Sequence, residues 1–580
     1  MMSMDWLRVN KIWFFLVFLR FCLVFLPQQG YIHPDEFFQS TEVIAGDVLN
    51  VSVVRSWEFS AGLRSVPPMY FQSGAPFHLM KVLPSFRTAY WAVVLPRLTV
   101  CLLSLIVDVA MARICGVFSL ESATPLRLLA SSYVVLIYLT RPFSNALETI
   151  VFSLFLILVS KTVKGIQCSQ AKISKEVETW QNDQYRRITL EEFRNKHSKC
   201  AESEHIEDSS TLTVLLIGVV TAIGLFVRPT FAAFSFGPIV WLITAVVIGG
   251  RSVVSYVFIM SVGALIPSIL IVLVDTRYYH GTSVLDFLSK FRQCVVTSEN
   301  VAECWEDFFG MFVVTPWNFM KYNSDPDNLS SHGRHPLYTH FLVNLPVLFG
   351  PLVLLFLREL FVFLLRRSMS LRGLLLCFVL TPILILSMFS HQEPRFLLPV
   401  LPLVILLCAL CLQDVRYKQT CVSLWCIFNL STILFYGFVH QGGVVPLLSY
   451  VEKHSHGPDA VFSHQDHFFF YHTYMPPRSL LLSNSSLKQI IDLQGSPMQN
   501  LTDSIKRQQL GSSYVALPGT LMEDFVQQNI SFDVTKIFPL HLSVEDPPPL
   551  EVVRELWQSF KSASTKLPDM LSLYLVKLKN

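Results

Sequence analysis

The sequence predicts a polytopic α-helical membrane protein with about 11 transmembrane helices and a small α/β domain at its C-terminal end. Hydrophobic residues make up 52% of the chain and charged residues only 15%, whereas an average soluble domain carries about 25% charged residues. The mean hydropathy is +0.47. The apolar residues are also grouped into runs of about 20, the length of helix that crosses a bilayer. These observations exclude an ordinary soluble protein.

Eleven apolar segments have about the length that a membrane-spanning helix needs. Several of them are short or bounded by proline, so the count is approximate. The predicted spans lie near 11–27, 90–113, 126–140, 144–160, 211–227, 230–250, 253–274, 341–365, 371–390, 396–413 and 418–439.

The first segment, 11–27, has the length of either a signal peptide or an uncleaved anchor. Arg20 interrupts it, and no small-residue cleavage site follows, because the chain continues Leu-Pro-Gln-Gln-Gly at 26–30. We therefore expect this segment to be retained as the first span.

The basic residues predict the orientation in the membrane. With the N-terminus in the cytosol, the polar insert at 161–210 is also cytosolic, and it carries nine Lys and Arg residues. Cytosolic loops are enriched in these residues. The insert mixes charges of both signs without apolar periodicity, which is typical of a solvated linker. The loops at 28–89 and 275–340 and everything after residue 440 then lie on the lumenal or extracellular side.

The chain is predicted to form two domains, 1–440 and 441–580. The first holds all 11 predicted spans. The second mixes strand-like runs, Ser513–Leu517 and Leu571–Val576, with a helical run at 550–562. This mixture predicts a small lumenal α/β domain.

Charge and cysteine usage add two further expectations. The formal net charge of +3 is too small to indicate a nucleic-acid partner. Of the 12 cysteines, Cys294 and Cys304 are the two that fall in predicted lumenal loops. In an oxidising compartment they either form a disulfide or remain as two thiols, and the sequence leaves both alternatives open.

The first lumenal loop begins with an unusual polar motif immediately after a predicted span. It contains His33, Pro34, Asp35 and Glu36, flanked by aromatic residues. Charged groups at the edge of the hydrocarbon region are costly and usually functional. A structural alternative is a helix start, with Pro34 in the first turn and both carboxylates favoured by the helix dipole. The two interpretations are compatible, because a helix start also fixes the position of a carboxylate.

Three more polar clusters fall on the same predicted side of the membrane. They lie in the turn at 140–148, in the loop at 275–340 and in the turn at 391–396. Their occurrence on one face argues for a single site at the lumenal membrane surface. They contribute the candidate site residues Arg141, Asn145, Glu148, Asp275, Arg334, His335, His391 and Arg395.

These motifs resemble the GT-C mannosyltransferases of the endoplasmic reticulum (ER), in glycosyltransferase family 22. The resemblance covers about residues 10–440 and implies the GT-C fold, an ER-membrane location and dolichol phosphate mannose as the donor. Within the family, the segments at 33–40 and 141–148 look most like the branch that adds an α1,2-linked fourth mannose to the third mannose of the glycosylphosphatidylinositol (GPI) precursor. Many relatives carry Lys where this chain has Gln392. The motifs that carry the resemblance are HPDE at 33–36, DTRYY at 275–279, HGRHPLYTH at 332–340 and HQEPRF at 391–396.

The resemblance also implies the chemistry, a single displacement that inverts the anomeric carbon. Asp35 is the expected base for the incoming hydroxyl, and its ordinary pKa near 3.9 keeps it ionised at lumenal pH. Glu36 is expected to orient the substrate or His33. Arg395 and His391 are expected to stabilise the departing phosphate. Alternatives for that role are His335, Arg334 and Arg141, and the other expected substrate-binding residues are Asn145, Glu148 and Asp275.

No metal or cofactor is expected. Asp325 and Asp327 have the spacing of a metal-binding D-x-D motif, but they lie in a polar stretch in which a turn is the more frequent use. Five histidines between 454 and 472 lack a metal-ligand spacing and are interpreted as scattered surface residues. These are His454, His456, His464, His467 and His472.

The sequence leaves two alternative functions open. Another mannosyltransferase of the same family would act on the third GPI mannose or on the lipid-linked oligosaccharide of N-glycosylation. A membrane transporter would use charges inside the spans, such as Arg20, Asp108 and Arg228. However, the sequence contains no corresponding hydropathy repeats, and its charged clusters gather at one membrane surface. The predicted partners are therefore the lipid bilayer, dolichol phosphate mannose and a GPI glycolipid.

Overall fold

The computed structural model describes most of the chain, and the middle of the predicted polar insert, 184–203, lies outside the described part. The described residues are 11–26, 28–183, 204–297, 301–325, 327–328, 333–367, 369–455, 460–463, 465–483, 489–508, 511–544, 547, 550–561 and 569–579.

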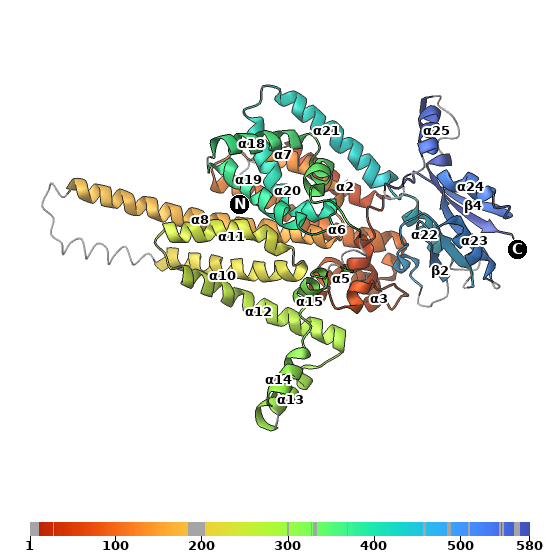
Figure 1. Cartoon of the computed structure of the whole chain (residues 1–580), viewed down its shortest axis with the longest axis horizontal. Coiled ribbons are helices and arrows are strands. Elements are labelled where there is room, and N and C mark those ends of the chain that lie inside the picture. Colours follow the sequence, from red (N-terminus) through yellow and green to blue (C-terminus); the bar gives the residue numbers. More distant parts are fainter. Residues whose placement is uncertain are drawn as a thin grey trace.

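A bundle of helices forms the larger part of the molecule, with a sheet domain at one end (Figure 1). Each predicted span contains a helix, so the helical membrane fold is confirmed. Within the described residues, six helical segments are long and apolar enough to cross a membrane unaided: 89–117, 144–171, 231–248, 253–280, 394–412 and 418–439. The helices of the bundle are α2 (Lys11–Phe25), α6 (Ala89–Val117), α7 (Ala123–Ser131), α8 (Ser144–Asp183), α10 (Glu204–Val227), α11 (Phe231–Ile248), α12 (Val253–His280), α17 (Leu345–Phe349), α18 (Leu352–Arg366), α19 (Leu371–Ser387), α20 (Leu401–Leu412) and α21 (Lys418–Leu434).

The predicted span at 341–365 is not one continuous helix. A π-helical turn, His340–Asn344, leads into α17, and α18 begins only after Gly350. Gly350 has a φ of +47°, and an added Cβ would lie 2.6 Å from the ring of Phe428. The chain therefore turns at a position that only glycine tolerates. A second bend of 112° separates α18 from α19.

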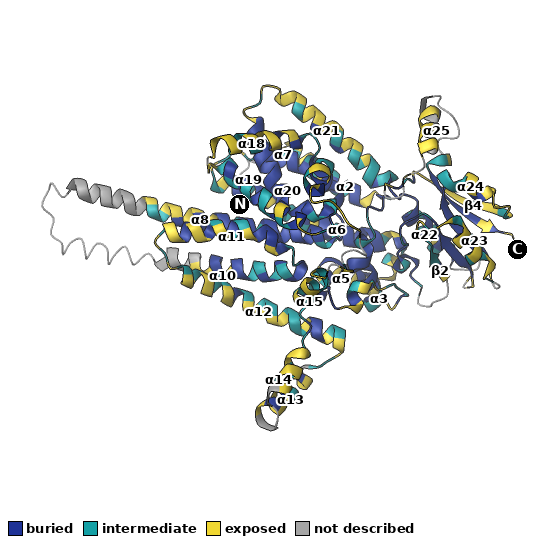
Figure 2. Cartoon of the chain, viewed as in Figure 1, coloured by how far each residue is buried: buried dark blue, intermediate teal, exposed yellow. Residues whose placement is uncertain are grey.

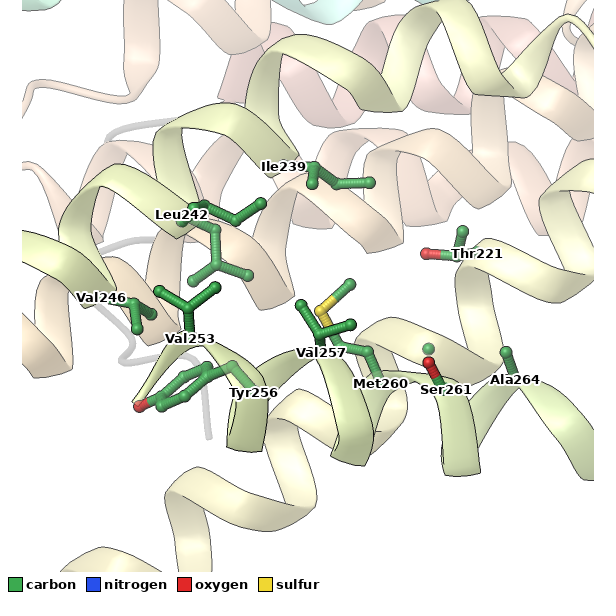
Figure 3. A pocket seen from close by; sticks show the side chains of 12 residues that line it. Thr221, Ile239, Leu242, Val246, Val253, Tyr256, Val257, Met260, Ser261 and Ala264 are labelled. Carbon is green, nitrogen blue, oxygen red and sulfur yellow. The ribbon is translucent and has the colours of Figure 1, made fainter. Parts of the chain in front are cut away.

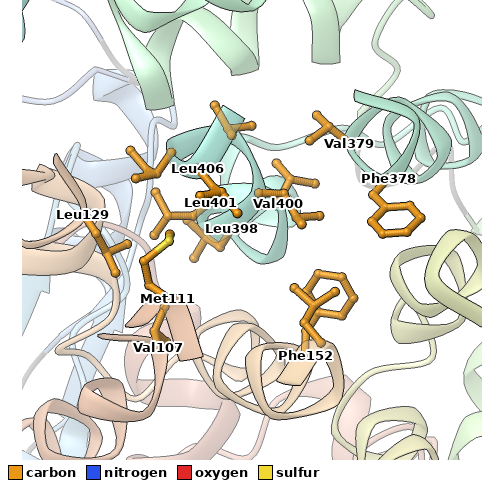
Figure 4. Packing of buried hydrophobic residues seen from close by; sticks show 14 of the residues in the cluster. Val107, Met111, Leu129, Phe152, Phe378, Val379, Leu398, Val400, Leu401 and Leu406 are labelled. Atoms are coloured by element: carbon orange, nitrogen blue, oxygen red, sulfur yellow. The ribbon is translucent and has the colours of Figure 1, made fainter. Parts of the chain in front are cut away.

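The centre of the bundle is α20, in which every residue from Leu401 to Leu412 is buried. A helix that is apolar on all sides is stable only when other elements surround it. Figure 4 shows side chains of this segment packed against Met111 of α6, Leu129 of α7 and Phe152 of α8. By contrast, α12 and α21 expose apolar side chains along their length (Figure 2), as expected of helices that face lipid.

Two charged residues inside the bundle pair with each other. Arg20 of α2 lies 2.8 Å from Asp108 of α6, and both are buried. The Trp13 indole also donates to Asp108 at 2.9 Å. A buried charge is tolerated when it is paired in this way. The pair therefore joins α2 to α6.

The segment 28–89, which is predicted to be the first lumenal loop, folds into short helices at the end of the bundle next to the sheet domain. They are a π-helical turn (Phe37–Thr41), α3 (Glu42–Leu49), α4 (Trp57–Ser60) and α5 (Val66–Val82). The loop after α12 forms α13 (Val284–Arg292), α14 (Val301–Gly310) and α15 (Thr315–Asn323). Cys294, in the π-helical turn that follows α13 (Gln293–Thr297), forms a disulfide with Cys304 of α14, which decides between the two alternatives.

The C-terminal region forms a five-stranded mixed sheet in the order β2-β1-β3-β5-β4. β1 is parallel to β2 and β3, and β5 is antiparallel to β3 and β4. The predicted α/β character is confirmed, including both predicted strands and the helix. The elements are α22 (Val444–Lys453), β1 (His467–Phe470), β2 (Gln489–Asp492), α23 (Met498–Lys506), β3 (Ser513–Pro518), α24 (Met522–Val526), β4 (Phe532–Pro539), α25 (Leu550–Lys561) and β5 (Ser572–Leu578).

The two faces of the sheet belong to different cores. Phe468, Tyr514 and Leu573 pack in one apolar cluster with Tyr31 and with residues of α3, α5 and α6. The opposite face packs against α23 and α24. An apolar core therefore joins the sheet domain to the first lumenal loop, and this junction positions the site.

Candidate active site

The His33–Glu36 motif begins the helical part of the first lumenal loop. The backbone N–H of Glu36 donates to the carbonyl of His33 at 3.1 Å, and the N–H groups of Phe37 and Phe38 donate to Pro34 at 3.0 and 3.1 Å. Asp35 therefore lies in a first helical turn, where the helix dipole favours a carboxylate. Its side chain is 23% exposed. The helix start holds Asp35 in place and leaves it accessible.

Asp35 forms an ion pair with Arg395, a residue 360 positions later in the chain. Gln39, one turn along the same helix, donates to the same carboxylate. The imidazole Nδ1 of His33 lies 3.5 Å from the other oxygen of Asp35. The structure therefore brings together three of the predicted site residues: His33, Asp35 and Arg395.

Glu393 is a second carboxylate at this site, and the sequence reasoning missed it. It binds the guanidinium of Arg395, with an Nη2 distance of 2.9 Å, and the imidazole of His391 at 2.8 Å. Its Oε2 also lies 3.7 Å from His33. Glu393 lies in the same turn as His391 and Arg395, which are both predicted site residues. Its place in that turn is the sequence feature that could have identified it.

The charges at this site stabilise one another. Burial by itself would raise the pKa of Asp35, but Arg395, and then His33, hold that pKa well below its ordinary value. Burial opposes ionisation of Glu393 as well, and Arg395 and His33 likewise hold its pKa well below the usual range. Both carboxylates are therefore ionised around one guanidinium.

A second layer of polar groups supports Gln39. Ser144, at the start of α8, donates to the amide oxygen of Gln39 at 2.8 Å. The Ser144 hydroxyl in turn accepts from Arg228 at 2.8 Å and from Arg64 at 3.3 Å. Arg64 is itself paired with Glu58 at 2.6 Å. This layer connects three chain segments, at 58–64, 144 and 228, to the position of Asp35.

Asn145 and Glu148 lie behind this layer. Glu148 accepts from the hydroxyl of Thr230 at 2.6 Å and lies 3.6 Å from Arg228. The Asn145 side-chain oxygen lies 3.5 Å from the same guanidinium. The ring of Phe396 lies 5.3 Å from the Arg228 guanidinium. The structure therefore places Asn145 and Glu148 around Arg228 and does not bring them to Asp35.

Glu36 and Arg141 have partners other than those expected. Glu36 is 1% exposed and binds Arg97 at 2.5 Å and Arg141 at 2.7 Å. Arg141 also donates to the carbonyl of Gly30 at 2.7 Å. Adjacent residues of a helix point to different faces, so Asp35 faces the cavity while Glu36 faces the core. Both oxygens of Glu36 accept from arginines in the core, and the expectation that Glu36 orients the substrate or His33 stays a prediction.

Asp275 also lies away from Asp35. It accepts from the backbone N–H of Val66 at 2.8 Å and from the hydroxyl of Thr315 at 3.1 Å. Val66 is the first residue of α5, where a carboxylate satisfies an otherwise unpaired helical N–H. Asp275 therefore joins the end of α12 to α5 and α15.

His335 reaches the turn at 391–396 from the preceding loop. Its Nδ1 accepts from the backbone N–H of Gln392 at 3.2 Å, and its ring lies 5.8 Å from that of His391. The neighbouring Arg334 is exposed. The side chain of Gln392 is buried and accepts from the backbone N–H of His340 at 3.1 Å. Gln392 therefore stabilises the turn and does not supply a contact in the cavity.

A cavity of about 770 Å³ lies beside Asp35, between the first lumenal loop and the sheet domain. His33, Asp35 and Trp57 line it from the loop, and Thr473, Tyr474 and Gln494 from the sheet domain. The sequence reasoning missed the residues of the sheet domain, because short polar loops between strands carry no motif. Asp35 is the one carboxylate among the residues that line this cavity.

A second cavity, of about 280 Å³, lies between α10, α11 and α12. Figure 3 shows Ile239, Leu242, Val257 and Met260 around it. Apolar groups make up almost all of its lining. Its lining includes the hydroxyl-bearing residues Thr221, Tyr256 and Ser261 and no charged side chain.

The described residues contain no group of three or more metal-type side chains that could hold an ion. Of the five histidines interpreted as surface residues, His467 is in fact buried in β1, because strand β1 is central in the sheet. His456 and His464 lie outside the described residues. Metal independence remains a prediction.

Comparison with known proteins gives a family and close relatives. The model of the Alg9-like mannosyltransferase family matches residues 11–483. The chain is 32% identical to GPI alpha-1,2-mannosyltransferase 4 of Homo sapiens, over 99% of this chain and 94% of that protein. It is 29% identical to GPI mannosyltransferase 4 of Drosophila melanogaster, over 92% and 86% of the two chains. Among solved structures, ArnT from Cupriavidus metallidurans bound to undecaprenyl phosphate matches with 10% identity and a TM-score of 0.47, over 92% of this chain and 97% of that one.

Proposed function

The chain belongs to the Alg9-like mannosyltransferase family, and from this premise we propose that it transfers mannose from dolichol phosphate mannose to the third mannose of a GPI precursor, forming an α1,2 linkage. The relatives named GPI mannosyltransferase 4 support this acceptor, since the human protein is 32% identical over 99% of the chain. The observation that carries the proposal is the pairing of Asp35 with Arg395 at the end of a substrate-sized cavity.

The proposed reaction is a single displacement. The acceptor hydroxyl oxygen attacks the anomeric carbon of the donor mannose, and the bond from that carbon to the phosphate oxygen breaks. Asp35 takes the hydroxyl proton, and dolichol phosphate leaves with the electron pair of the broken bond. Arg395, beside Asp35, stabilises the charge that develops on the phosphate, because its planar fork matches phosphate oxygens. The mannose goes to the acceptor, the proton goes to Asp35 and the leaving group departs as dolichol phosphate. The proposed step uses no metal ion.

The ion pair suggests how Asp35 becomes a stronger base during the reaction. In the structure Arg395 holds the pKa of Asp35 low, and a carboxylate with a low pKa accepts a proton poorly. A donor phosphate next to Arg395 shares the positive charge, so the stabilisation of the Asp35 carboxylate weakens and its pKa rises. Glu393 and His33 keep the guanidinium oriented during this exchange.

The protein is a multi-pass membrane protein, and we propose the ER membrane as its location. The proposed orientation has a cytosolic N-terminus and a lumenal C-terminal domain. In Figure 1 the far end of α8 and the sheet domain lie at opposite ends of the bundle. This arrangement supports an orientation in which the polar insert and the sheet domain are on opposite sides.

Two measurements test the proposal. The purified protein in detergent should transfer mannose from dolichol phosphate mannose to a three-mannose GPI precursor without a sealed compartment, which a transporter would require. Cells that lack the protein should accumulate three-mannose GPI precursors and keep normal N-glycan precursors. Accumulation of truncated lipid-linked oligosaccharides with unchanged GPI lipids would instead assign the chain to another branch of the family.

A further inference from the structure

The cavity beside Asp35 extends away from the charged groups toward the sheet domain. Its volume of about 770 Å³ lies within the range of about 300–1,000 Å³ that is typical of ligand sites. Arg55, which also lines it, is already bonded to Asp47 and to the hydroxyl of Tyr278 at 2.6 Å. Beyond Asp35 the cavity therefore presents neutral polar and aromatic groups, which suit an uncharged ligand with hydroxyl groups.

Three loops around this cavity contain strained backbone. Gln441, His472 and Gln494 all line the cavity, and their φ angles are +52°, +52° and +49°. Left-handed conformations of such residues persist only where the surroundings impose them, and they cluster at ligand sites. Hydrogen bonds hold them here. The N–H of His472 donates to the carbonyl of Gln494 at 2.8 Å, and the N–H of Tyr474 donates to the side chain of Gln441 at 3.3 Å.

The loop at 472–475 is also fixed to the membrane domain. The hydroxyl of Tyr31 donates to the carbonyl of Met475 at 3.0 Å. The ring of Tyr474 contacts those of Tyr31 and His33, with centroid distances of 5.3 and 6.3 Å. The sheet-domain wall of the cavity is therefore held at a set distance from Asp35. A wall that is ordered before binding lowers the entropic cost of binding.

Two residues that line this cavity carry a buried hydroxyl that makes no hydrogen bond to the described residues. Thr473 is 6% exposed, and its Oγ1 makes no hydrogen bond to the protein. Ser56 lines the cavity from the opposite wall, and its Oγ also makes no hydrogen bond to the described residues. A buried polar atom without a partner is costly, and a sugar hydroxyl can both donate to it and accept from it.

We infer that this cavity holds the sugar chain of the acceptor glycolipid and that Thr473 is a specificity-determining residue that hydrogen-bonds one hydroxyl of that chain. The inference rests on the proposed function, which places the reacting hydroxyl of the acceptor at Asp35. The sheet domain thereby takes part in acceptor choice, although the reacting groups belong to the membrane domain.

The test uses the purified full-length protein with dolichol phosphate mannose and a three-mannose GPI acceptor. Thr473→Val keeps the shape of the side chain and removes its hydroxyl. We expect the acceptor KM to rise about three- to tenfold, the range for one neutral hydrogen bond, with kcat and the donor KM unchanged. The thermal unfolding midpoint of the ligand-free variant should not fall, because the substitution removes a buried hydroxyl that has no partner there. Thr473→Ser, which keeps the hydroxyl, should restore the acceptor KM.

Acceptors that each lack one mannose hydroxyl identify the partner group. The wild-type protein should discriminate against one of them, and Thr473→Val should lose that discrimination, because the two groups act as a coupled pair. If the wild-type protein is active but Thr473→Val keeps the wild-type acceptor KM and discrimination, the subsite assignment is wrong. The proposed function is unaffected by that result. A wild-type protein that transfers no mannose to this acceptor overturns the proposed function, and the subsite with it.

Discussion

At the scale of single residues, the site is built around one guanidinium shared by two carboxylates. Arg395 contacts Asp35 and Glu393, and His33 and His391 each contact Glu393. Each carboxylate lowers the cost of burying the guanidinium, and the guanidinium keeps both carboxylates ionised. Removing Arg395 therefore lets the pKa values of Asp35 and Glu393 rise, which makes the cluster accessible to kinetic tests.

Asp35→Asn is expected to reduce mannose transfer by at least about a hundredfold, the low end for loss of a general base. The protein should remain folded and inserted, since Arg395 keeps its contact with Glu393. Transfer by the purified variant in detergent measures the effect. Asp325→Asn is a matched control, because Asp325 is exposed, and it should retain full activity. Turnover at the wild-type level by Asp35→Asn would rule out Asp35 as the base.

Arg395→Gln is expected to move the acid side of the pH profile of kcat/KM to higher pH. Burial raises the pKa of Asp35, whereas Arg395 lowers it, so loss of the guanidinium lets that pKa rise. Because the carboxylate is the active form, activity is then lost as the pH falls through a higher value than in the wild type. Arg395→Lys keeps a positive charge and should shift the profile less. An unshifted acid limb in Arg395→Gln would contradict the assigned coupling.

At the scale of elements, the loop after α12 forms a disulfide-bonded helical hairpin that extends sideways from the bundle (Figure 1). Ser283 caps α13 through a capping box with Asp286. The hairpin exposes several apolar side chains, among them Leu285 and Leu288. None of its residues lines the cavity. We therefore expect a substitution in the hairpin to change the stability of the hairpin without abolishing mannose transfer.

Cys294→Ser is expected to loosen the hairpin without abolishing transfer. A disulfide that closes a loop of about this length contributes about 3 kcal/mol, and here the loss is confined to α13 and α14. Hydrogen exchange should therefore rise within 284–310, and Cys304→Ser should match it. Mass mapping of the wild-type protein under non-reducing conditions should recover one linked peptide pair. Two separately alkylated peptides would contradict the disulfide.

At the scale of the whole molecule, the sheet domain is docked on the membrane domain by an apolar core and a buried carboxylate. Glu42 of α3 is fully buried. Its oxygens accept from the backbone N–H groups of Arg478 and Ser479, both at 3.0 Å, and of Val54 at 3.2 Å. One side chain therefore connects the first lumenal loop to the sheet domain that forms the other wall of the cavity.

Glu42→Ala is expected to destabilise the docked sheet domain by about 3 kcal/mol, because it leaves buried N–H groups without an acceptor. Glu42→Gln keeps one oxygen and should cost less. Thermal unfolding and limited proteolysis between the two domains measure the difference. Because docking positions Thr473, Glu42→Ala should also raise the acceptor KM. Equal stability of the Ala variant and the wild type would show that the apolar core alone docks the domain.

The orientation of the whole protein gives a further expected outcome. In intact microsomes, protease added from the cytosol should reach the insert at 161–210, which carries nine Lys and Arg residues. The region after residue 440 should stay protected until the membrane is opened. Protection of the insert in closed vesicles would reverse the orientation and place the site in the cytosol.

The local pattern of the sequence predicts much of the fold. Apolar runs locate the helices, because a bilayer requires about 20 apolar residues in a row. Short strand-like runs locate β3 and β5. The sequence also singles out Asp35, His33 and Arg395, since charges next to a membrane span are uncommon. The interruption at Gly350 could not be predicted, because a glycine in an apolar run can equally continue a helix, and only packing against Phe428 requires the turn.

The sequence by itself determined the class of protein, the helical membrane domain and the residues around which the site is built, because composition and periodicity are local properties. Only the tertiary structure decided which of those residues meet. Asp35 pairs with Arg395 across 360 positions, whereas the adjacent Glu36 is turned into the core. The tertiary structure also brings Thr473 to the cavity, because the sheet domain is docked on the membrane domain. The physical reason is that side-chain partners depend on the direction of each side chain on its helix and on how distant helices pack, and neither is encoded in a short motif.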